Sequence, residues 1–280
     1  MGTGEGDYMK RQNVFDPDCP NASRMYDHLL GGSDNHAPDR VAAEELLKVA
    51  PDAADIAVRN RAFLKRAVKY LAEHGVRQFL DIGSGLPTRE NVHQMAQAAA
   101  PGARVVYVDN DPIVFAHLQA ILSDGNTVAT SGDMRATEQI LADPRLNEVI
   151  SLDGPVGVIL TSVLHFVPDT DGPHDIVARL MRAMPRGSYL VLSHGKHAGS
   201  AGEADEARIL EIYNRTNKPL YPRGESQIIQ FFDGLEIIQP GVVPVQDWRP
   251  NGDGPVGRTP VRAPGEGPGA VLGGVAVKIH

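Results

Sequence analysis

The 280-residue chain contains a single cysteine, Cys19, which excludes a disulfide framework and a cluster of thiolate metal ligands within the chain. No apolar run approaches the ~20 residues that a membrane-spanning helix requires, and the first residues lack the apolar core of a secretory signal. Positive charge is also scarce, because 27 Lys and Arg residues stand against 35 Asp and Glu. Dedicated binders of nucleic acid or of anionic membranes need a basic surplus. We therefore predict a cytoplasmic protein without a nucleic-acid or membrane partner.

The first 75 residues have the apolar spacing of helices. Asn21 is a good N-cap, and the apolar positions after it recur with a helical period up to Gly31, where a helix-ending glycine belongs. A second helix is predicted to begin at Pro38, and a third, longer one to end at Gly75.

From residue 76 the pattern changes to short apolar strands that alternate with helices, which indicates a parallel sheet covered on both faces. Pro240 and Pro244 interrupt a later apolar segment, which we expect to be an edge or bulged strand. Residues 250–269 are rich in Gly and Pro, so a long loop is expected before a final strand. The five predicted strands before that segment are 76–83, 103–109, 126–133, 155–166 and 187–195.

The strongest functional signal is the segment FLDIGSGLPT at residues 79–88. Asp81 lies near the end of the first predicted strand, and Gly83 and Gly85 follow it. Small residues at such a turn let backbone N–H groups and the next helix approach a polar or anionic ligand. A dinucleotide fingerprint places Gly or Ala where this chain has Thr88, whereas an acid ahead of the first glycine suits a cationic cofactor. A tight turn without a ligand is the structural alternative.

Two further acids follow the next two strands. Asp109 ends the second strand, where a carboxylate can accept both hydroxyls of a ribose, and an acid that ends an apolar strand needs a partner. In the segment SGDM, Asp133 and Met134 can hydrogen-bond an amino group and pack against a purine, although a helix N-cap explains Asp133 nearly as well. Open α/β sheets bind ligands at the carboxyl ends of their strands. Taken together, these acids favour a ligand site at this edge of the sheet, whereas none of them does so separately.

The order of LDIGSG, VDNDP, GDM and ILTSVLHF resembles that of the class I S-adenosylmethionine-dependent methyltransferases. The segments PNASRMYDHLLGGSDN, RNRAFLKRAVKYLAEHGVRQFLDIGSGLPTRENVHQ and DGLEIIQPGVVPVQDWRP are similar to an actinobacterial methyltransferase family long known only as a domain of unknown function. The resemblance implies a Rossmann-like α/β fold with a seven-stranded, mostly parallel sheet whose last strand is antiparallel. It also implies S-adenosylmethionine as the cofactor, an N-terminal arm and helical lid in residues 1–75, and a methyltransferase domain in residues 76–280.

Carried over position by position, the resemblance implies a set of cofactor-binding residues. The loop after the first strand would hold the methionine end of the cofactor, Asp109 the ribose, and the segment after the third strand the adenine. Backbone groups at the end of the fourth strand would bind the ammonium, and a tyrosine of the lid would contact the ligand. The full set is Tyr26, Asp81, Gly83, Ser84, Gly85, Asp109, Asn110, Asp133, Met134, Thr161 and Ser162.

No residue pattern identifies catalytic machinery. Methyl transfer needs mainly in-line positioning of the acceptor, and a general base helps when the acceptor is a hydroxyl or a charged amine. His165 and His194 follow the fourth and fifth strands and are the candidate bases, with a purely structural role as the alternative for each. The ten histidines show no metal-ligand spacing, so no metal is expected.

We expect a methyltransferase that acts on a small-molecule acceptor. The sequence determines neither the acceptor, nor the element that is methylated, nor the oligomeric state. One alternative is a non-catalytic S-adenosylmethionine-binding protein or regulator with the same fold, because no catalytic base stands out. The other is a nucleotide-dependent oxidoreductase, which Asp81, Thr88 and the long helical segment before the first strand disfavour.

Overall fold

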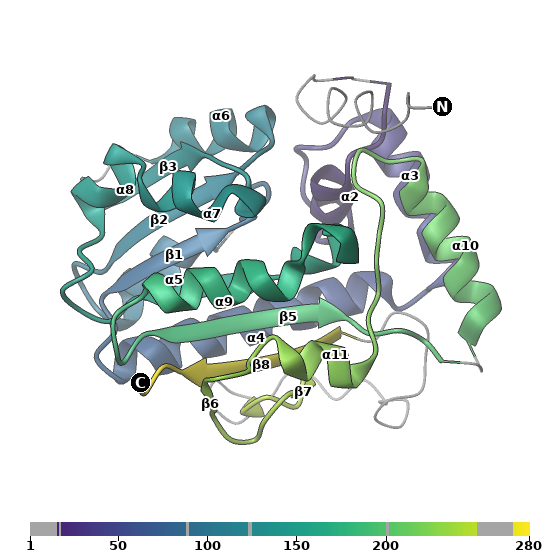
Figure 1. Ribbon diagram of the computed structural model, residues 1–280. Helices are drawn as coiled ribbons and strands as arrows, with labels where there is room; N and C mark the ends of the chain where they lie inside the picture. Colours follow the sequence, from purple (N-terminus) through teal and green to yellow (C-terminus); the bar gives the residue numbers. More distant parts are fainter. Residues whose placement is uncertain (1–15, 17, 88–89, 123–124, 200–201, 251–270) are drawn as a thin grey trace, which may run out of the picture.

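The computed structural model describes residues 16, 18–87, 90–122, 125–199, 202–250 and 271–280 (Figure 1). Apart from Pro250, the predicted loop of residues 250–269 lies outside these ranges, as does Thr88. Within the described ranges, no helix is long and apolar enough to cross a membrane.

One mixed sheet organises the chain, in the order β3-β2-β1-β4-β5-β8-β6, with β7 paired to β8. The strands β1 to β5 run parallel, and β8 is antiparallel to β5 and to β6. The predicted fold class is confirmed, including the antiparallel last strand. The bounds are β1 (Gln78–Ile82), β2 (Arg104–Asp109), β3 (Thr127–Ser131), β4 (Gly157–Thr161), β5 (Tyr189–Gly195), β6 (Glu236–Ile237), β7 (Val243–Pro244) and β8 (Val271–Val277).

The sheet has eight strands rather than seven because the segment predicted as one edge strand is divided. β6 and β7 are two residues long each and pair with different parts of β8. Pro240 lies between them, and proline has no N–H with which to continue a ladder. The expectation of an interrupted edge strand is therefore correct, and the interruption explains the additional strand.

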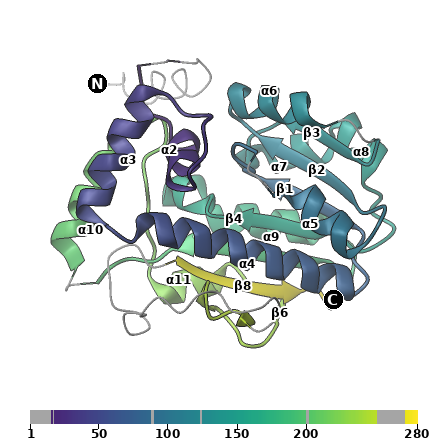
Figure 2. The same cartoon turned by 180° about the vertical axis from the view of Figure 1, so that it is seen from behind.

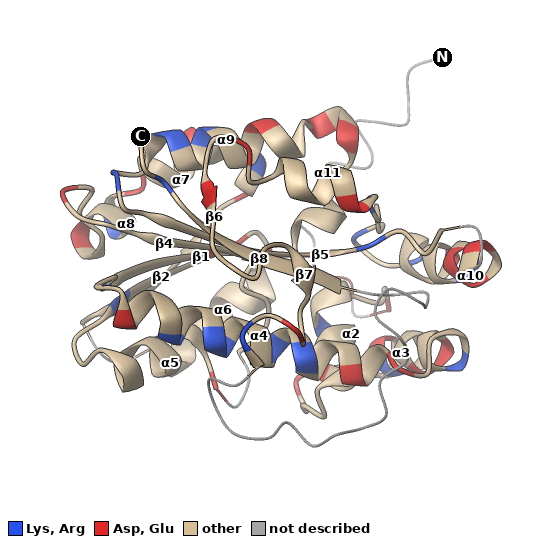
Figure 3. Cartoon of the chain, turned by 90° about the horizontal axis from the view of Figure 1, so that it is seen from below, with Lys and Arg blue, Asp and Glu red and all other residues tan. Residues whose placement is uncertain are grey.

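Helices cover both faces of the sheet, as Figure 3 shows with the sheet seen between two layers. Alternate residues of β1 serve the two cores: Leu80 and Ile82 belong to one, and Phe79 to the other. The first core is closed by α7 (Thr137–Leu141), α8 (Pro144–Val149), α9 (Pro173–Ala183) and α11 (Glu225–Gln230). The second is closed by α4 (Ala53–Glu73), α5 (Val92–Ala99) and α6 (Pro112–Ile121).

A third, smaller core lies at the carboxyl end of the sheet. It joins the helices of the predicted lid, α2 (Ala22–Leu29) and α3 (Ala37–Val49), to α10 (Glu203–Asn214), which follows β5. Met25, Leu46 and Ile209 are buried together there. In Figures 1 and 2, α3 and α10 lie side by side although they are far apart in the sequence. We call α2 and α3 the lid helices.

Helix α4 connects the lid helices to the sheet. It contacts α2 and α3, while its residues Phe63 and Leu71 share a core with Phe79 of β1. The helix thus packs as part of the sheet layer, although it precedes the boundary drawn at residue 75. The division at that residue stays a prediction.

Candidate active site

The loop after β1 forms a cradle of small residues. Gly83 and Gly85 have φ values of +72° and +67°, in the left-handed region that favours glycine. A Cβ at Gly83 would overlap the side chain of Val163, whereas a Cβ at Gly85 would meet no atom within 4 Å. Between them, the buried hydroxyl of Ser84 has no hydrogen-bond partner in the described part of the chain. A buried polar atom without a partner, beside open space, fits a ligand.

Asp109 lies beside this cradle at the end of β2 and is only 2% exposed. Its Oδ2 accepts a hydrogen bond from the backbone N–H of Gly85 at 2.9 Å, and its Oδ1 accepts one from that of Asp111 at 3.0 Å. Each carboxylate oxygen can accept a second hydrogen bond. Asp109 therefore holds the loop in place and can still receive two hydroxyls of a ligand.

Two cavities meet at Asp109. The larger, of about 580 Å³, extends past the ends of β2 and β3 and is lined there by Asn110, Asp133 and Met134. The smaller, of about 190 Å³, extends from the glycine loop under the lid helices. Five residues, which we call the junction residues, line both cavities: Gly83, Asp109, Val163, Phe166 and Lys218.

The smaller cavity is mostly apolar. Helices α3, α4 and α10 contribute residues that are far apart in the sequence, and Tyr26 of α2 and Tyr213 of α10 add their rings. The apolar residues supplied by α2, α3, α4, α10 and the segments beside them are Leu29, Leu46, Ala50, Ala53, Ile56, Ala57, Ile209 and Leu220. Such a lining suits an apolar ligand and excludes water.

Asp133 at the larger cavity can serve both of its predicted roles, as a helix N-cap and as a contact for a ligand. Asp133 Oδ1 accepts a hydrogen bond from the backbone N–H of Arg135 at 2.9 Å, and its carboxylate pairs with the Arg135 guanidinium. Burial alone would raise the pKa of Asp133, but the hydrogen bonds from Arg135 hold it below its usual value. The carboxylate stays ionised and lines the cavity next to Met134.

The end of β4 carries backbone strain. Ser162 has a φ of +53°, which non-glycine residues adopt rarely and mostly at functional sites. Its N–H donates to Ser193 Oγ, and Ser193 Oγ in turn donates to Asn60 Oδ1 at 2.7 Å. Thr161 and Ser162 both line the smaller cavity, so the structure brings them to the glycine cradle as the resemblance implies.

Asn60 extends this chain of hydrogen bonds to the lid. Its Nδ2 donates to the Tyr26 hydroxyl at 3.1 Å, and that hydroxyl donates to the carbonyl of Ala57. Burial raises the pKa of Tyr26, which keeps the phenol neutral. Asn60 and Ser193 were not identified from the sequence. Each is a polar residue on an otherwise apolar face, of α4 and of β5 respectively, and that was the one feature that could have indicated them.

Asp81 lies beneath the cradle rather than in it. It lines neither cavity and is 5% exposed. Burial raises its pKa to about 7, against the opposing effect of the Arg61 guanidinium and with a further contribution from Asp109. A role of Asp81 in holding the methionine end of the cofactor stays a prediction.

The two candidate histidines have different surroundings. His194 lines neither cavity: its Nδ1 is 2.8 Å from the carbonyl oxygen of Gly195, and its Nε2 is 2.8 Å from the guanidinium of Arg223. A carbonyl only accepts and a guanidinium only donates, so both ring nitrogens are occupied in the neutral form. His165 lines the smaller cavity, and its Nδ1 accepts from the backbone N–H of Gly195 at 3.2 Å.

Burial is the main reason that both rings stay neutral. It lowers the pKa of His194 to about 3 and that of His165 well below its usual value, with a further lowering from Arg223 in each case.

Among the described residues, no group of three or more His, Cys, Asp or Glu side chains could hold a metal ion.

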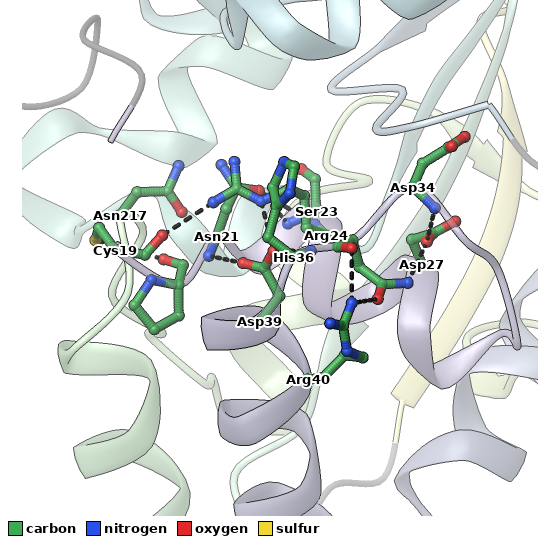
Figure 4. Close-up of polar contacts among 12 residues, drawn as sticks. Cys19, Asn21, Ser23, Arg24, Asp27, Asp34, His36, Asp39, Arg40 and Asn217 are labelled. Carbon is green, nitrogen blue, oxygen red and sulfur yellow. Dashed lines mark hydrogen bonds and ion pairs between the residues drawn. The ribbon is translucent and has the colours of Figure 1, made fainter. Parts of the chain in front are cut away.

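A buried polar network fastens the lid helices next to the site (Figure 4). Asp39 accepts from the backbone N–H of Asn21 at 2.8 Å and pairs with Arg24 at 2.7 Å, with the Asp39 side chain fully buried. Beyond the lid, Asn21 Nδ2 donates to Asp111 Oδ2 at 2.7 Å. Because Asp111 also donates its N–H to Asp109, two hydrogen bonds connect Asn21 to Asp109.

The mixed sheet, the glycine cradle and the acids at the ends of β2 and β3 define the class of Rossmann-like methyltransferases that use S-adenosylmethionine as their cofactor. The chain belongs to the S-adenosyl methyltransferase family, whose family model matches residues 9–279. The resemblance stated from the sequence motifs is thereby confirmed.

Solved structures agree with this membership. A DUF574 family protein from Streptomyces avermitilis is 36% identical, with 94% of this chain and 99% of that chain covered and a TM-score of 0.86. A candidate methyltransferase from Thermobifida fusca is also 36% identical, with coverages of 94% and 96% and a TM-score of 0.84. The plantazolicin methyltransferase BamL, solved with a triazolic desmethylPZN analogue and SAH, is 12% identical over 99% of both chains with a TM-score of 0.54, which concerns the fold alone. The comparison with curated proteins gives no match.

Proposed function

We propose that the protein transfers the methyl group of S-adenosylmethionine to a small, mostly apolar acceptor bound under the lid helices. The observation that carries the proposal is the meeting of two unlike cavities at the junction residues. One is lined by ionised and polar groups at the ends of β2 and β3, and the other by apolar side chains of α3, α4 and α10. A transferase needs its donor and its acceptor side by side, and the junction supplies that arrangement.

The residues of the larger cavity fit the adenosine part of the cofactor. Asp109 has two spare acceptor positions for the ribose hydroxyls, and Asn110, Asp133 and Met134 offer polar and apolar contacts for the adenine. The methionine part fits the cradle, where the free Ser84 hydroxyl and the open side of Gly85 leave room for a polar group. When bound there, the cofactor supplies an activated methyl group on a sulfonium.

The chain itself contributes mainly positioning and the exclusion of water. Among the described residues that line the smaller cavity, Asp109 is assigned to the ribose and Nδ1 of His165 is hydrogen-bonded to a backbone N–H, so neither is placed to act as a base on the acceptor. Acceptors that are already nucleophilic, or that lose a proton to solvent, suit such a site. Holding the acceptor atom in line with the methyl group then provides most of the acceleration.

Calorimetry with S-adenosylhomocysteine tests the cofactor part of the proposal. We expect one site per chain with micromolar or tighter affinity, after removal of any cofactor carried through purification. A screen for methyl transfer from labelled S-adenosylmethionine to small apolar acceptors tests the catalytic part. Binding without transfer to any acceptor would favour the non-catalytic alternative, and the absence of binding by folded, ligand-free protein would refute both.

A further inference from the structure

Lys218 is a cation at the junction of the two cavities. It lies in the segment between α10 and α11 and lines both cavities, together with Phe166. Within the described ranges, its ammonium has no hydrogen bond and no ion pair, unlike the paired ammonium groups of Lys65 and Lys196. A cation on a half-buried lysine that lines a cavity fits an anionic ligand.

The backbone around Lys218 is fixed, so its position in the cavity is built into the fold. Thr216 Oγ1 donates to the carbonyl of Lys218 at 3.0 Å and accepts from its N–H at 3.1 Å. Asn217 donates its N–H to Pro20 and accepts from the N–H of Ala22 with its side chain. The backbone at Lys218 is therefore tied to the segment that begins α2.

Other polar groups of the smaller cavity can donate hydrogen bonds to an oxygen-bearing anion. Asp109 is an acceptor and is assigned above to the ribose hydroxyls, so it is not one of them, and Arg61 donates to the backbone carbonyl of Glu90. Because Nδ1 of His165 accepts from the N–H of Gly195, its neutral ring carries the proton on Nε2 and can only donate from that atom. The cavity thus offers donors and a positive charge beside an apolar lining.

We propose that the methyl acceptor carries a carboxylate, which Lys218 binds at the junction of the two cavities while the apolar body of the acceptor fills the space under the lid helices. This inference deepens the proposed methyl transfer and rests on it. The ion pair fixes one end of the acceptor beside the cradle, so it orients the reacting atom toward the methyl group.

The test uses the full chain saturated with S-adenosylhomocysteine and two matched probes, 3-phenylpropanoate and the uncharged 3-phenylpropanamide. Calorimetry should give the acid at least a tenfold tighter affinity than the amide. Lys218→Met should abolish this preference, whereas Lys218→Arg, which keeps the charge, should retain it. Lys48→Met on the exposed side of α3 is the matched control and should leave the preference unchanged.

Several outcomes would overturn the inference. They are equal affinities of wild-type protein for the acid and the amide, no binding of the acid in the millimolar range, or a preference that survives in a folded Lys218→Met variant. Thermal melting establishes that each variant is folded. Failure of S-adenosylhomocysteine to bind, before any probe is added, would instead refute the proposed function.

The carboxylate of the cofactor itself is the other source of an anion, and a second comparison separates the two. S-adenosylhomocysteine carries the methionine-derived carboxylate, and 5′-methylthioadenosine lacks it. If Lys218 binds the acceptor, Lys218→Met should bind both compounds as the wild type does. A variant that loses affinity for S-adenosylhomocysteine alone would assign Lys218 to the cofactor and overturn the inference.

Discussion

Replacement of Asp109 tests the cofactor site most directly. Its two carboxylate oxygens are proposed to accept the two ribose hydroxyls while they hold the N–H groups of Gly85 and Asp111. A hydrogen bond to a charged group contributes about 1.5–3 kcal/mol. Loss of both ribose contacts in Asp109→Ala should therefore cost about 3–6 kcal/mol of binding free energy, which is a loss of affinity of more than a hundredfold.

The same change also affects stability, and the structure gives the size of that effect. Asp109→Ala removes the acceptor of the part-buried N–H of Gly85 and of the buried N–H of Asp111, at a cost of up to about 1–3 kcal/mol each. Asp109→Asn is the milder variant, because its Oδ1 can still accept from Asp111 while its amide faces the N–H of Gly85, which is also a donor. We expect it to stay folded and to lose about half of the binding free energy that the alanine variant loses.

Calorimetry with S-adenosylhomocysteine and with its 2′-deoxy analogue measures the effect. In wild-type protein the analogue should bind more weakly, and in Asp109→Asn the difference between the two ligands should shrink. Asp143→Asn is the matched control, since Asp143 caps α8 and lines neither cavity. A folded Asp109→Asn variant that binds S-adenosylhomocysteine within threefold of wild type would refute the reasoning.

Two further predictions concern stability. Arg24→Met leaves the buried carboxylate of Asp39 without its ion-pair partner, so the free energy of unfolding in urea should decrease by about 3–5 kcal/mol. The control Lys65→Met removes one partner of an exposed ion pair and should cost less than about 1 kcal/mol. Similar losses for the two variants would contradict this prediction. Below pH ~6.5 the unfolded chain protonates His165 and His194, while the folded protein keeps both rings neutral. The free energy of unfolding should therefore decrease as the pH is lowered, by up to about 1.4 kcal/mol per pH unit for each ring. For His194 the fall should continue to about pH 3, and an NMR titration that shows either folded ring protonating near pH 6.5 would disprove the prediction.

Hydrogen bonds connect the N-terminal helix α2 to Asp109, the residue proposed to bind the ribose. Asn21 is the N-cap of α2 and donates to Asp111, which in turn donates to Asp109.

Much of this architecture follows from the sequence by itself. The alternation of short apolar strands with helices fixes the parallel sheet, since each buried strand must be covered on both faces. The glycines after β1 and the acid at the end of β2 are local features, and their meeting follows from the parallel order of the strands. Asn21 and Gly31 likewise mark the ends of α2 through backbone requirements that involve only neighbouring residues.

Other features were decided only by the tertiary structure, because they depend on residues that are distant in the chain. Three contacts join segments that share no sequence pattern. Helix α10 packs against α3, hydrogen bonds run from Ser193 through Asn60 to the lid helices, and the Arg223 guanidinium contacts Nε2 of His194. Burial in turn raises the pKa of Asp81 to about 7, although its sequence position resembles that of a ligand contact. A sequence specifies which side chains are present and their local periodicity, whereas partners, burial and charge state arise only when distant segments pack together.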